Sequence, residues 1–382
     1  MSPFTEARMH LAVELTGAGW HPAAARWAGL DPATLVSAAH HVALARTAAR
    51  RGFDLALLPH TFHPYDGPLL DAVALAARIA PVVPGIGLVP TATVTHTEPF
   101  HVSKSIATLD IVSGGRAGWE PAVSGTQAAA DLFGRKSAAP LDVLWREAAD
   151  AIEVVVRLWD SWEDGAVIRD AATGRYIDRD KLHYIDFAGE FFSVKGPSIT
   201  PRPPQGHPLV VLRADHEEAL PVAARWADVV RIAAPDLPSA ASARDRIRAA
   251  VAGAGRDPDE VTVLLDVEVH LAADRHRARH DLAELDALAG RELPAFSVRV
   301  LGPPTDLADL IGRAVRTRAA DGVTLVPLVL PADLDAVADQ VVPLLAGRGL
   351  LRTGSAGGSL RARFGLARPA NHFAAQFELG AS

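Results

Sequence analysis

Residues 109–124 read LDIVSGGRAGWEPAVS, and this stretch decides the fold. The apolar start reads as the end of a helix, the two glycines break that helix, and residues 115–123 read as a strand. A strand flanked by helices is normally an apolar run, so Glu120 and Pro121 should mark its exposed end, because proline cannot donate to a neighbouring strand. In a barrel of alternating strands and helices, that end carries the chemistry.

Seven further short apolar runs read as strands, and alanine-rich helical stretches separate them. The runs are residues 9–15, 53–58, 85–91, 208–214, 227–233, 261–269 and 322–330. This alternation predicts a parallel sheet built from strand–helix units in an α/β fold. Eight units predict a TIM (β/α)8 barrel, and a doubly wound sheet, which also alternates, is the alternative.

Two insertions interrupt the repeating pattern of strands and helices. The first, residues 159–207, lies between strands 4 and 5, and its turn-rich later half is too long for a simple connection. The second, residues 274–296, is helical and lies between strands 7 and 8. The basic, glycine-rich tail, residues 348–382, is expected to wrap the barrel or a partner subunit. Without repeats or low-complexity linkers, residues 1–382 are expected to form a single domain.

Composition excludes several classes of function. The chain has 382 residues, 49% of them hydrophobic, and a net charge of −7, so it has neither the basic surface of a nucleic-acid binder nor a polybasic membrane anchor. It has no cysteine, which excludes disulfides, thiolate nucleophiles and cysteine metal sites. Neither a signal peptide nor a membrane-spanning run is visible, so we expect a cytoplasmic protein.

Several separate blocks of the sequence, in order and with similar spacing, resemble one known family. The blocks are TEPFHVSKSIATLDIVSGGRAGW (97–119), FG (133–134), VVRLWDSWEDGA (155–166), KLHYIDFAGEFFSVKGPSITPRPPQGHP (181–208), RGLLRT (348–353) and LARPAN (366–371). They resemble the bacterial luciferase-like flavin monooxygenases, in particular the nitrilotriacetate and dibenzothiophene-sulfone monooxygenase branch.

The resemblance implies a fold, a cofactor and partners. It implies a TIM barrel that uses reduced FMN from a separate flavin reductase, together with O2, to oxidise a small organic substrate. A deazaflavin is the alternative to FMN. It also implies a homodimer or homotetramer.

At the fourth strand, the resemblance suggests contacts to the flavin ring. Relatives continue after Gly-Arg-x-Gly-Trp with asparagine and then Val-Thr-Ser, whereas this chain keeps Trp119 and Ser124 but has Glu120 in place of the asparagine. A carboxylate can serve only the single N–H donor of the ring. Glu120 is therefore a candidate to accept that N–H or to contact the substrate, and so a candidate catalytic residue; a salt bridge at the barrel rim is the alternative.

The second and third strands supply two more candidates. Where relatives read Ala-Asp-Ser, this chain has Pro59, His60 and Thr61; His60 could transfer protons or bind an anion, or could simply pack. The Ser-Thr-Thr-Tyr of relatives becomes residues 93–96, TVTH. Thr93 keeps a hydroxyl where the family places one beneath the flavin, although threonine is also simply a good strand residue.

The largest departure from the family follows the fifth strand. Relatives read Gln-Ala-Gly-x-Ser-x-x-Gly, whose small residues hold the FMN phosphate, whereas residues 212–219 here read LRADHEEA. A carboxylate about 5 Å from a phosphate would cost on the order of 3 kcal/mol per unit of phosphate charge. We expect the acids to face solvent, and the candidates for cofactor binding are Arg213, His216 and Arg231. The arginines could instead pair with Asp215 and with Asp266 or Glu268.

Charged residues also alternate along the seventh strand. Asp266, Glu268 and His270 share one face and, with His60 and Glu120, could form a metal site. We expect no metal, because charges at a barrel mouth usually satisfy one another.

Three functions follow from these residues. The first is an FMN-dependent monooxygenase. The second is a flavin-free partner or binding subunit that keeps the barrel but has lost the cofactor site. The third is a cofactor-independent enzyme that uses the charged barrel mouth for acid–base chemistry.

Overall fold

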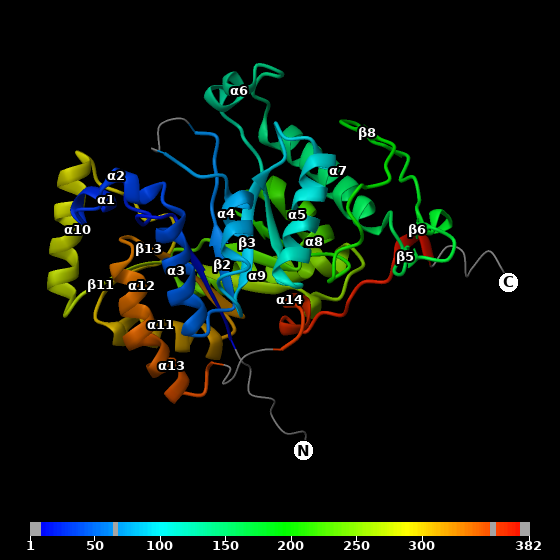
Figure 1. Ribbon diagram of the computed structural model, residues 1–382. Helices are drawn as coiled ribbons and strands as arrows, with labels where there is room; N and C mark the ends of the chain where they lie inside the picture. The colour runs from blue at the N-terminus through cyan, green and yellow to red at the C-terminus, as the bar shows by residue number, and fades with distance from the viewer. Residues whose placement is uncertain (1–8, 64–67, 352–356, 375–382) are drawn as a thin grey trace. The chain divides into compact units, whose positions relative to one another are not determined.

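The computed structural model describes residues 9–63, 68–351 and 357–374 (Figure 1). By their internal contacts these residues form two compact units. The first unit comprises residues 9–60, 68–90 and 211–351, and the second comprises residues 61–63, 91–210 and 357–374.

Eight parallel strands close into a barrel with helices, as the sequence predicts. In sheet order they are β10 (Val229–Ile232), β9 (Leu209–Arg213), β4 (Gly118–Ala122), β3 (Gly87–Thr93), β2 (Leu55–Leu58), β1 (His10–Glu14), β13 (Gly322–Pro327) and β11 (Thr262–Leu271). Pairing of β10 with β11 completes the ring. A further strand, β12 (Arg299–Gly302), pairs in parallel with the last residues of β11. The sequence did not predict this strand.

Helices separate the strands along the chain. Those of the first unit are α1 (Ala24–Trp27), α2 (Pro32–Leu35), α3 (Ala38–Arg50), α4 (Ala72–Ile79), η2 (Glu217–Ala219), α8 (Leu220–Trp226), α9 (Leu237–Gly253), η3 (Pro258–Glu260), α10 (Arg275–Ala289), α11 (Pro304–Arg316), α12 (Ala332–Ala336), η4 (Val337–Val341) and α13 (Val342–Gly347). Side-chain caps set several of their starts; for example, Asp236 accepts the N–H of Ser239 at the start of α9.

The second unit contains residues 159–207, where the first insertion was predicted, and residues 357–374 of the tail. Its helices are α5 (Pro99–Ser113), α6 (Gln127–Phe133), α7 (Leu141–Asp160), η1 (Arg179–Lys181) and α14 (Leu360–Arg363). Two small hairpins pair β5 (Val167–Asp170) with β6 (Arg175–Ile177) and β7 (Phe187–Ala188) with β8 (Ser193–Val194). In the tail, residues 352–356 and 375–382 lie outside the described residues.

The stretch at residues 109–124 folds as a helix, a glycine turn and a strand. Helix α5 ends at Ser113, and Gly114 caps it in the left-handed conformation at φ 67°. The expectation that Glu120 and Pro121 mark an exposed strand end is wrong, since both are buried. The reason is the register: β4 stays paired with β3 past these residues, as far as Ala122.

The polar side chain of Gln205 ties three segments of the second unit together. Its amide donates to Asp110 of α5 at 2.6 Å and to the carbonyl of Ala117 at 2.8 Å, and its oxygen accepts the N–H of Arg361 in α14 at 2.8 Å. The part of the tail at α14 therefore packs within the second unit. Burial raises the pKa of the Asp110 carboxyl, and the hydrogen bonds from Gln205 and Ala117 oppose that rise.

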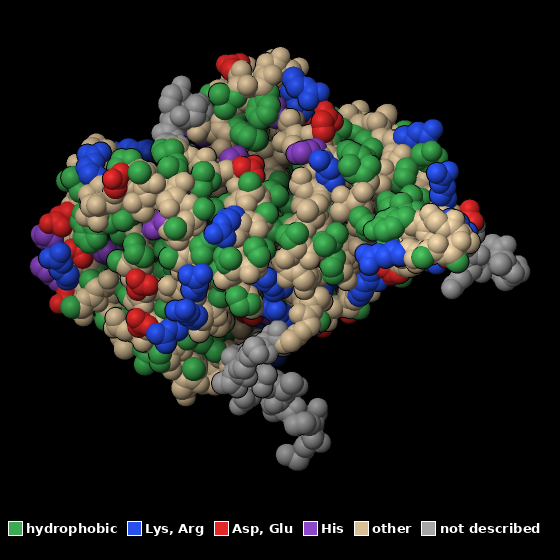
Figure 2. Space-filling view, viewed as in Figure 1, with side chains coloured by type: hydrophobic (Ala, Val, Ile, Leu, Met, Phe, Trp, Pro, Cys, Tyr) green, Lys and Arg blue, Asp and Glu red, His purple; other side chains and the backbone are tan. Residues whose placement is uncertain are grey.

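Helix α10 packs beside α1 in the first unit (Figure 1). On its apolar side, Leu285 of α10 belongs to one buried hydrophobic cluster with Leu328, the residue after β13. Two buried histidines of the barrel reach its acidic residues: His21 Nε2 lies 3.1 Å from Asp286, and His270 Nε2 lies 3.3 Å from Asp281. Histidine and acidic side chains also gather on its outer face (Figure 2). The contacts of His21 and His270 therefore anchor the inner side of this helix.

Within residues 9–63, 68–351 and 357–374, no helix has both the length and the apolar character needed to cross a membrane.

Candidate functional site

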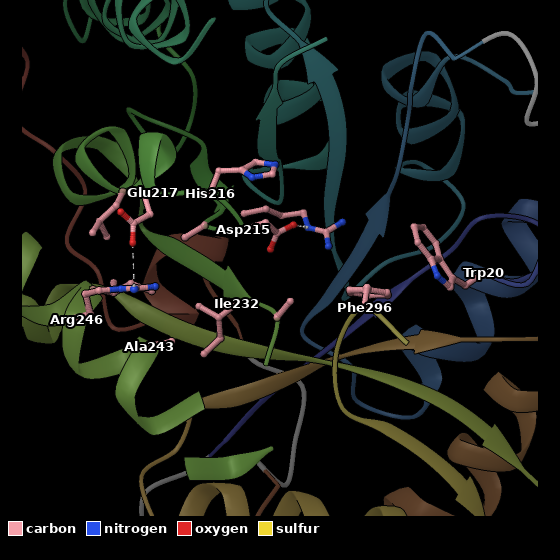
Figure 3. Close-up of a pocket in the computed structure, with 13 residues that line it drawn as sticks. Trp20, Asp215, His216, Glu217, Ile232, Ala243, Arg246 and Phe296 are labelled. Atoms are coloured by element: carbon pink, nitrogen blue, oxygen red, sulfur yellow. Dashed lines mark ion pairs between the residues drawn. The ribbon is translucent and has the colours of Figure 1, made fainter. Parts of the chain in front are cut away.

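A cavity of about 460 Å³ lies in the first unit at the carboxyl ends of β9 and β10 (Figure 3). This volume is in the usual range for small-molecule sites. Its walls come from the turn after β9, from α9 and from two aromatic rings. The lining residues are Trp20, Arg213, Ala214, Asp215, His216, Glu217, Leu220, Ile232, Ala233, Ala243, Arg246, Ile247 and Phe296. The sequence candidates Arg213 and His216 are thus brought together.

Arg213, the last residue of β9, carries the central positive charge of the cavity. Its Nε lies 3.0 Å from Asp215 Oδ2, and one Nη lies 3.5 Å from Asp266. Its guanidinium also stands 5.4 Å from the ring centroid of Phe296, within cation–π range. Because the Arg213 side chain keeps 27% exposure, it remains accessible from the cavity.

Arg231 is placed differently from Arg213. Its side chain is 1% exposed and is not among the residues that line the cavity. Its guanidinium donates to Glu14 at 2.7 Å and, through two nitrogens, to Asp266 at 3.0 Å. The pairing with Asp266 that the sequence left open is confirmed. Binding of phosphate by Arg231 remains untested, and the structure gives this side chain two carboxylate partners inside the barrel.

The acidic turn after β9 is exposed, as expected. The side chains of Asp215, Glu217 and Glu218 are exposed, and Glu217 opens the short helix η2. Glu217 is 91% exposed and lies 3.8 Å from an Nη of Arg246 (Figure 3). The acids therefore sit at the cavity rim, and water screens much of their charge.

Arg246 is a cavity residue that sequence reasoning missed. It lies on α9, in the run ARDRIRAA, where arginines at helical spacing look like a solvated face. Its neighbours on the helix do have structural partners, since Arg244 pairs with Asp321 and Arg248 with Asp259. Only the fold identifies Arg246 as the arginine of this run that borders the cavity.

A strand carboxylate fixes the aromatic wall of the cavity. Glu268 of β11 accepts the backbone N–H groups of Phe296 at 2.7 Å and Ser297 at 3.2 Å and also pairs with Arg299. Phe296 in turn lies 5.2 Å from the Trp20 ring, centroid to centroid. Glu268 thus positions the main chain that carries Phe296.

The other two acidic or basic side chains on this face of β11 are also paired. Burial raises the pKa of Asp266, and the Arg231 and Arg213 guanidinium groups oppose the rise. His270 lies between Asp333 at 3.1 Å and Asp281 at 3.3 Å. Burial lowers the pKa of His270, but the hydrogen bonds and charges of the two carboxylates outweigh it and raise the pKa above its ordinary value. Each of the three charged side chains on this face of β11 therefore has partners of opposite charge from other segments.

In the second unit, Thr93 ends β3. Its side chain is buried, and its Oγ1 has no hydrogen-bond partner within the part of the chain that the structure describes. Glu120 is 5% exposed and lies opposite Thr91 of β3 in the sheet register. The backbone N–H of Ser124, just past β4, donates to Thr95 Oγ1 at 3.0 Å.

Trp119 packs towards the helices rather than into an open space. Its ring lies 6.3 Å from the Trp159 ring of α7 in an edge-on arrangement, and its Nε1 donates to the carbonyl of Ala92 at 3.3 Å. The side chain is fully buried. The structure therefore gives Trp119 a packing role, and its contact with a cofactor remains a prediction.

His60 lies two residues beyond β2 and is half-buried. It belongs to the first unit, whereas Glu120 belongs to the second. A catalytic role for either residue remains a prediction.

Comparisons with known proteins give one consistent result. The family described as "Luciferase-like monooxygenase" matches residues 17–321. Nitrilotriacetate monooxygenase component A of Aminobacter aminovorans is 30% identical over 96% of this chain and 98% of its own length. Dibenzothiophene-sulfone monooxygenase of Rhodococcus erythropolis (strain XP) is 30% identical over 95% and 98%.

The solved structure of EDTA monooxygenase from Chelativorans sp. BNC1 agrees with these matches. It superposes with a TM-score of 0.85 at 25% identity and covers 94% of this chain and 99% of its own.

Proposed function

The chain belongs to the luciferase-like monooxygenase family and is a flavin-dependent monooxygenase of small organic molecules, and from this we propose that reduced FMN binds with its phosphate in the Arg213 cavity. The observation that carries the proposal is a cavity of about 460 Å³ that two arginines and two aromatic rings line. Arginine suits phosphate because its planar guanidinium can donate two parallel hydrogen bonds.

The charges at the cavity are compatible with a phosphate, with one condition. The lining side chains include two arginines, Arg213 and Arg246, and two acids, Asp215 and Glu217. A phosphate must therefore replace Asp215 beside Arg213. The Asp215 side chain is 31% exposed and can turn to water, so this exchange does not strand a buried carboxylate.

When bound, the flavin supplies the oxygen chemistry, and the protein binds, orients and shields it. Arg213 and Arg246 would hold the phosphate, and His216 borders the same cavity. Thr93 is the best-supported candidate for a ring contact because its buried hydroxyl has no partner among the described residues. Trp119 and Ser124 remain candidate cofactor contacts, and His60 and Glu120 remain candidate catalytic residues.

The partners follow from the relatives. The name "component A" of the nitrilotriacetate enzyme supports a second component, so we propose a separate flavin reductase that delivers reduced FMN, with O2 as co-substrate. A homodimer or homotetramer in the cytoplasm completes the proposal.

One titration tests the proposal. The protein is titrated without oxygen with reduced FMN and with reduced riboflavin, which lacks the phosphate, and binding is followed by calorimetry. We expect FMN to bind at least about tenfold more tightly. Arg213→Ala should weaken FMN binding by about 10- to 100-fold and leave riboflavin unchanged, because hydrogen bonds to charged groups contribute about 1.5–3 kcal/mol.

The titration has one control variant and two results that would count against phosphate binding. Arg248→Ala removes another arginine of the same region, one that pairs with Asp259, and should change neither affinity. Equal affinities for FMN and riboflavin would remove the phosphate assignment. No binding of reduced FMN at high micromolar concentration would favour the flavin-free subunit, for which the existing Arg213–Asp215 pair is the supporting observation.

A further inference from the structure

Two buried polar side chains at the carboxyl end of β3 have no hydrogen-bond partner among the described residues. His96 is 8% exposed, and neither of its ring nitrogens has a partner; the same holds for Thr93 Oγ1. Such groups are rare, and each costs about 1–3 kcal/mol when left unsatisfied. The neighbouring backbone and Thr95 are satisfied, since Val94 N donates to Ala122 O and Thr95 Oγ1 accepts from Ser124. The two side chains are therefore specific exceptions in a well-bonded segment.

Aromatic packing fixes the orientation of the His96 ring. The ring stacks on Phe133 of α6 with a centroid distance of 4.8 Å and an interplanar angle of 13°. The edge of Phe62 meets the same Phe133 ring at 4.7 Å and 80°. These three residues come from the segments that follow β2, β3 and β4, and loops after barrel strands form the functional face of this fold.

The charge state of His96 restricts what it can bind. Burial lowers the pKa of His96, and the nearby Lys136 ammonium lowers it further. At pH 7 the ring is therefore neutral, with one N–H donor and one nitrogen acceptor. It offers no countercharge to an anion, and Lys136 is already paired with Glu147. Because this ion pair carries no net charge, it offers a cation no countercharge either.

We propose that His96 forms a substrate-binding site for an uncharged oxygen, such as a ketone or sulfone oxygen, on an aromatic molecule that packs against Phe62 and Phe133, while the Thr93 hydroxyl beside it keeps its assignment to the flavin ring. This inference rests on the proposed function in one respect, that the ligand is the organic substrate of a monooxygenase. His96 is then a residue that determines specificity.

The test uses the full-length protein without flavin, so that it does not depend on FMN binding. Acetophenone, benzoate and benzylammonium serve as neutral, anionic and cationic probes of similar size, and the ¹⁵N resonances of the His96 ring report their binding. We expect saturable shifts with acetophenone and at least about tenfold weaker binding of the two ions. His96→Phe keeps the aromatic stack and should weaken acetophenone binding by about five- to tenfold, whereas His96→Gln keeps a donor and should bind within about threefold of the wild type.

Controls guard against indirect effects. Thermal unfolding shows whether each variant folds, and His101→Phe, at an exposed histidine of α5, should leave probe binding unchanged. The inference is overturned if no probe shifts the His96 resonances, if either ion binds as well as acetophenone, or if His96→Phe binds acetophenone like the wild type. A failed FMN titration would leave this result intact, so the two proposals fail separately.

Discussion

The buried charges around Arg231 in the first unit are paired with one another, whereas two buried polar side chains at the end of β3 in the second unit have no partner among the described residues. In the first unit, Arg231 lies between the carboxylates of Glu14 and Asp266, at 2.7 and 3.0 Å. In the second, His96 and Thr93 are buried with polar atoms that no described residue satisfies. A matched network holds its own geometry and contributes to stability. Unmatched groups cost stability, so a buried polar side chain that lacks a partner at a barrel mouth is a candidate for binding a ligand.

The largest expected effect comes from replacing Arg231, which pairs with both carboxylates of the network. Arg231→Met leaves Glu14 and Asp266 buried without their shared cation, so the free energy of unfolding should fall by about 3–5 kcal/mol. Urea titration measures this change. Arg50→Met, at an exposed arginine of α3, should change stability by no more than about 0.5 kcal/mol. A loss below about 1 kcal/mol for Arg231→Met would mean that the network does not stabilise the barrel.

A second test uses the paired histidine of the same unit. The pKa of His270 is raised in the folded state, so folding takes up a proton between the ordinary histidine value and the folded one. The stabilisation is fully present below about pH 6.5 and is lost as pH rises through the folded pKa, with a slope of at most about 1.4 kcal/mol per pH unit. Urea titrations across this range should show the decline.

His270→Gln should remove that component of the pH dependence. His280→Gln, at an exposed histidine of the same region on α10, should leave it in place. An unchanged pH profile in His270→Gln would contradict the assignment.

A third test concerns the competition at the cavity. Asp215 lies 3.0 Å from Arg213, and both side chains are about 30% exposed. Asp215→Asn should therefore tighten reduced FMN binding by about fivefold, equivalent to about 1 kcal/mol. Reduced riboflavin should bind as before, and the gain should shrink in 0.5 M salt. Glu218→Gln, on the same turn but outside the cavity lining, is the matched control. If Asp215→Asn also tightened the binding of reduced riboflavin, the increase in affinity would not depend on the phosphate.

The smallest expected effect is at the unmatched threonine. Because the Thr93 hydroxyl has no partner within the described residues, Thr93→Val should change the free energy of unfolding by less than about 0.5 kcal/mol, or raise it. Urea titration measures this change in the free energy of unfolding. A loss above about 1.5 kcal/mol would show that the hydroxyl is satisfied in the folded protein and would erase the contrast between Thr93 and the Arg231 network.

Local sequence patterns predicted the eight strands, and the family resemblance favoured a barrel over the doubly wound sheet that the alternation also allowed. All eight apolar runs form strands, since strand-forming residues, glycine turns and alternating helices agree with one another. The run at 299–302 was missed because only four residues form β12, too few for a periodic signal. Glu120 was expected at an exposed end because sequence alone cannot say how far the β3–β4 ladder continues.

The candidate site was predictable only in part. Arg213 and His216 were found because they follow a strand, where barrel chemistry is placed. The pairing of Arg231 with Glu14 could not be predicted from the sequence, because the two residues are 217 positions apart in the chain. Arg246 could not be separated from the other arginines of α9 without the fold, and nothing in the sequence shows that His96 is buried.

The contact between Glu268 and the chain at residues 296 and 297 has a consequence for how this pocket can diversify. The Glu268 carboxylate accepts hydrogen bonds from the backbone N–H groups of Phe296 and Ser297. Every residue except proline has such an N–H group. The side chain at position 296 can therefore be exchanged for a larger or smaller one while its main chain stays in place. Evolution or an engineer can reshape this wall of the pocket at one position without rebuilding the loop that carries it.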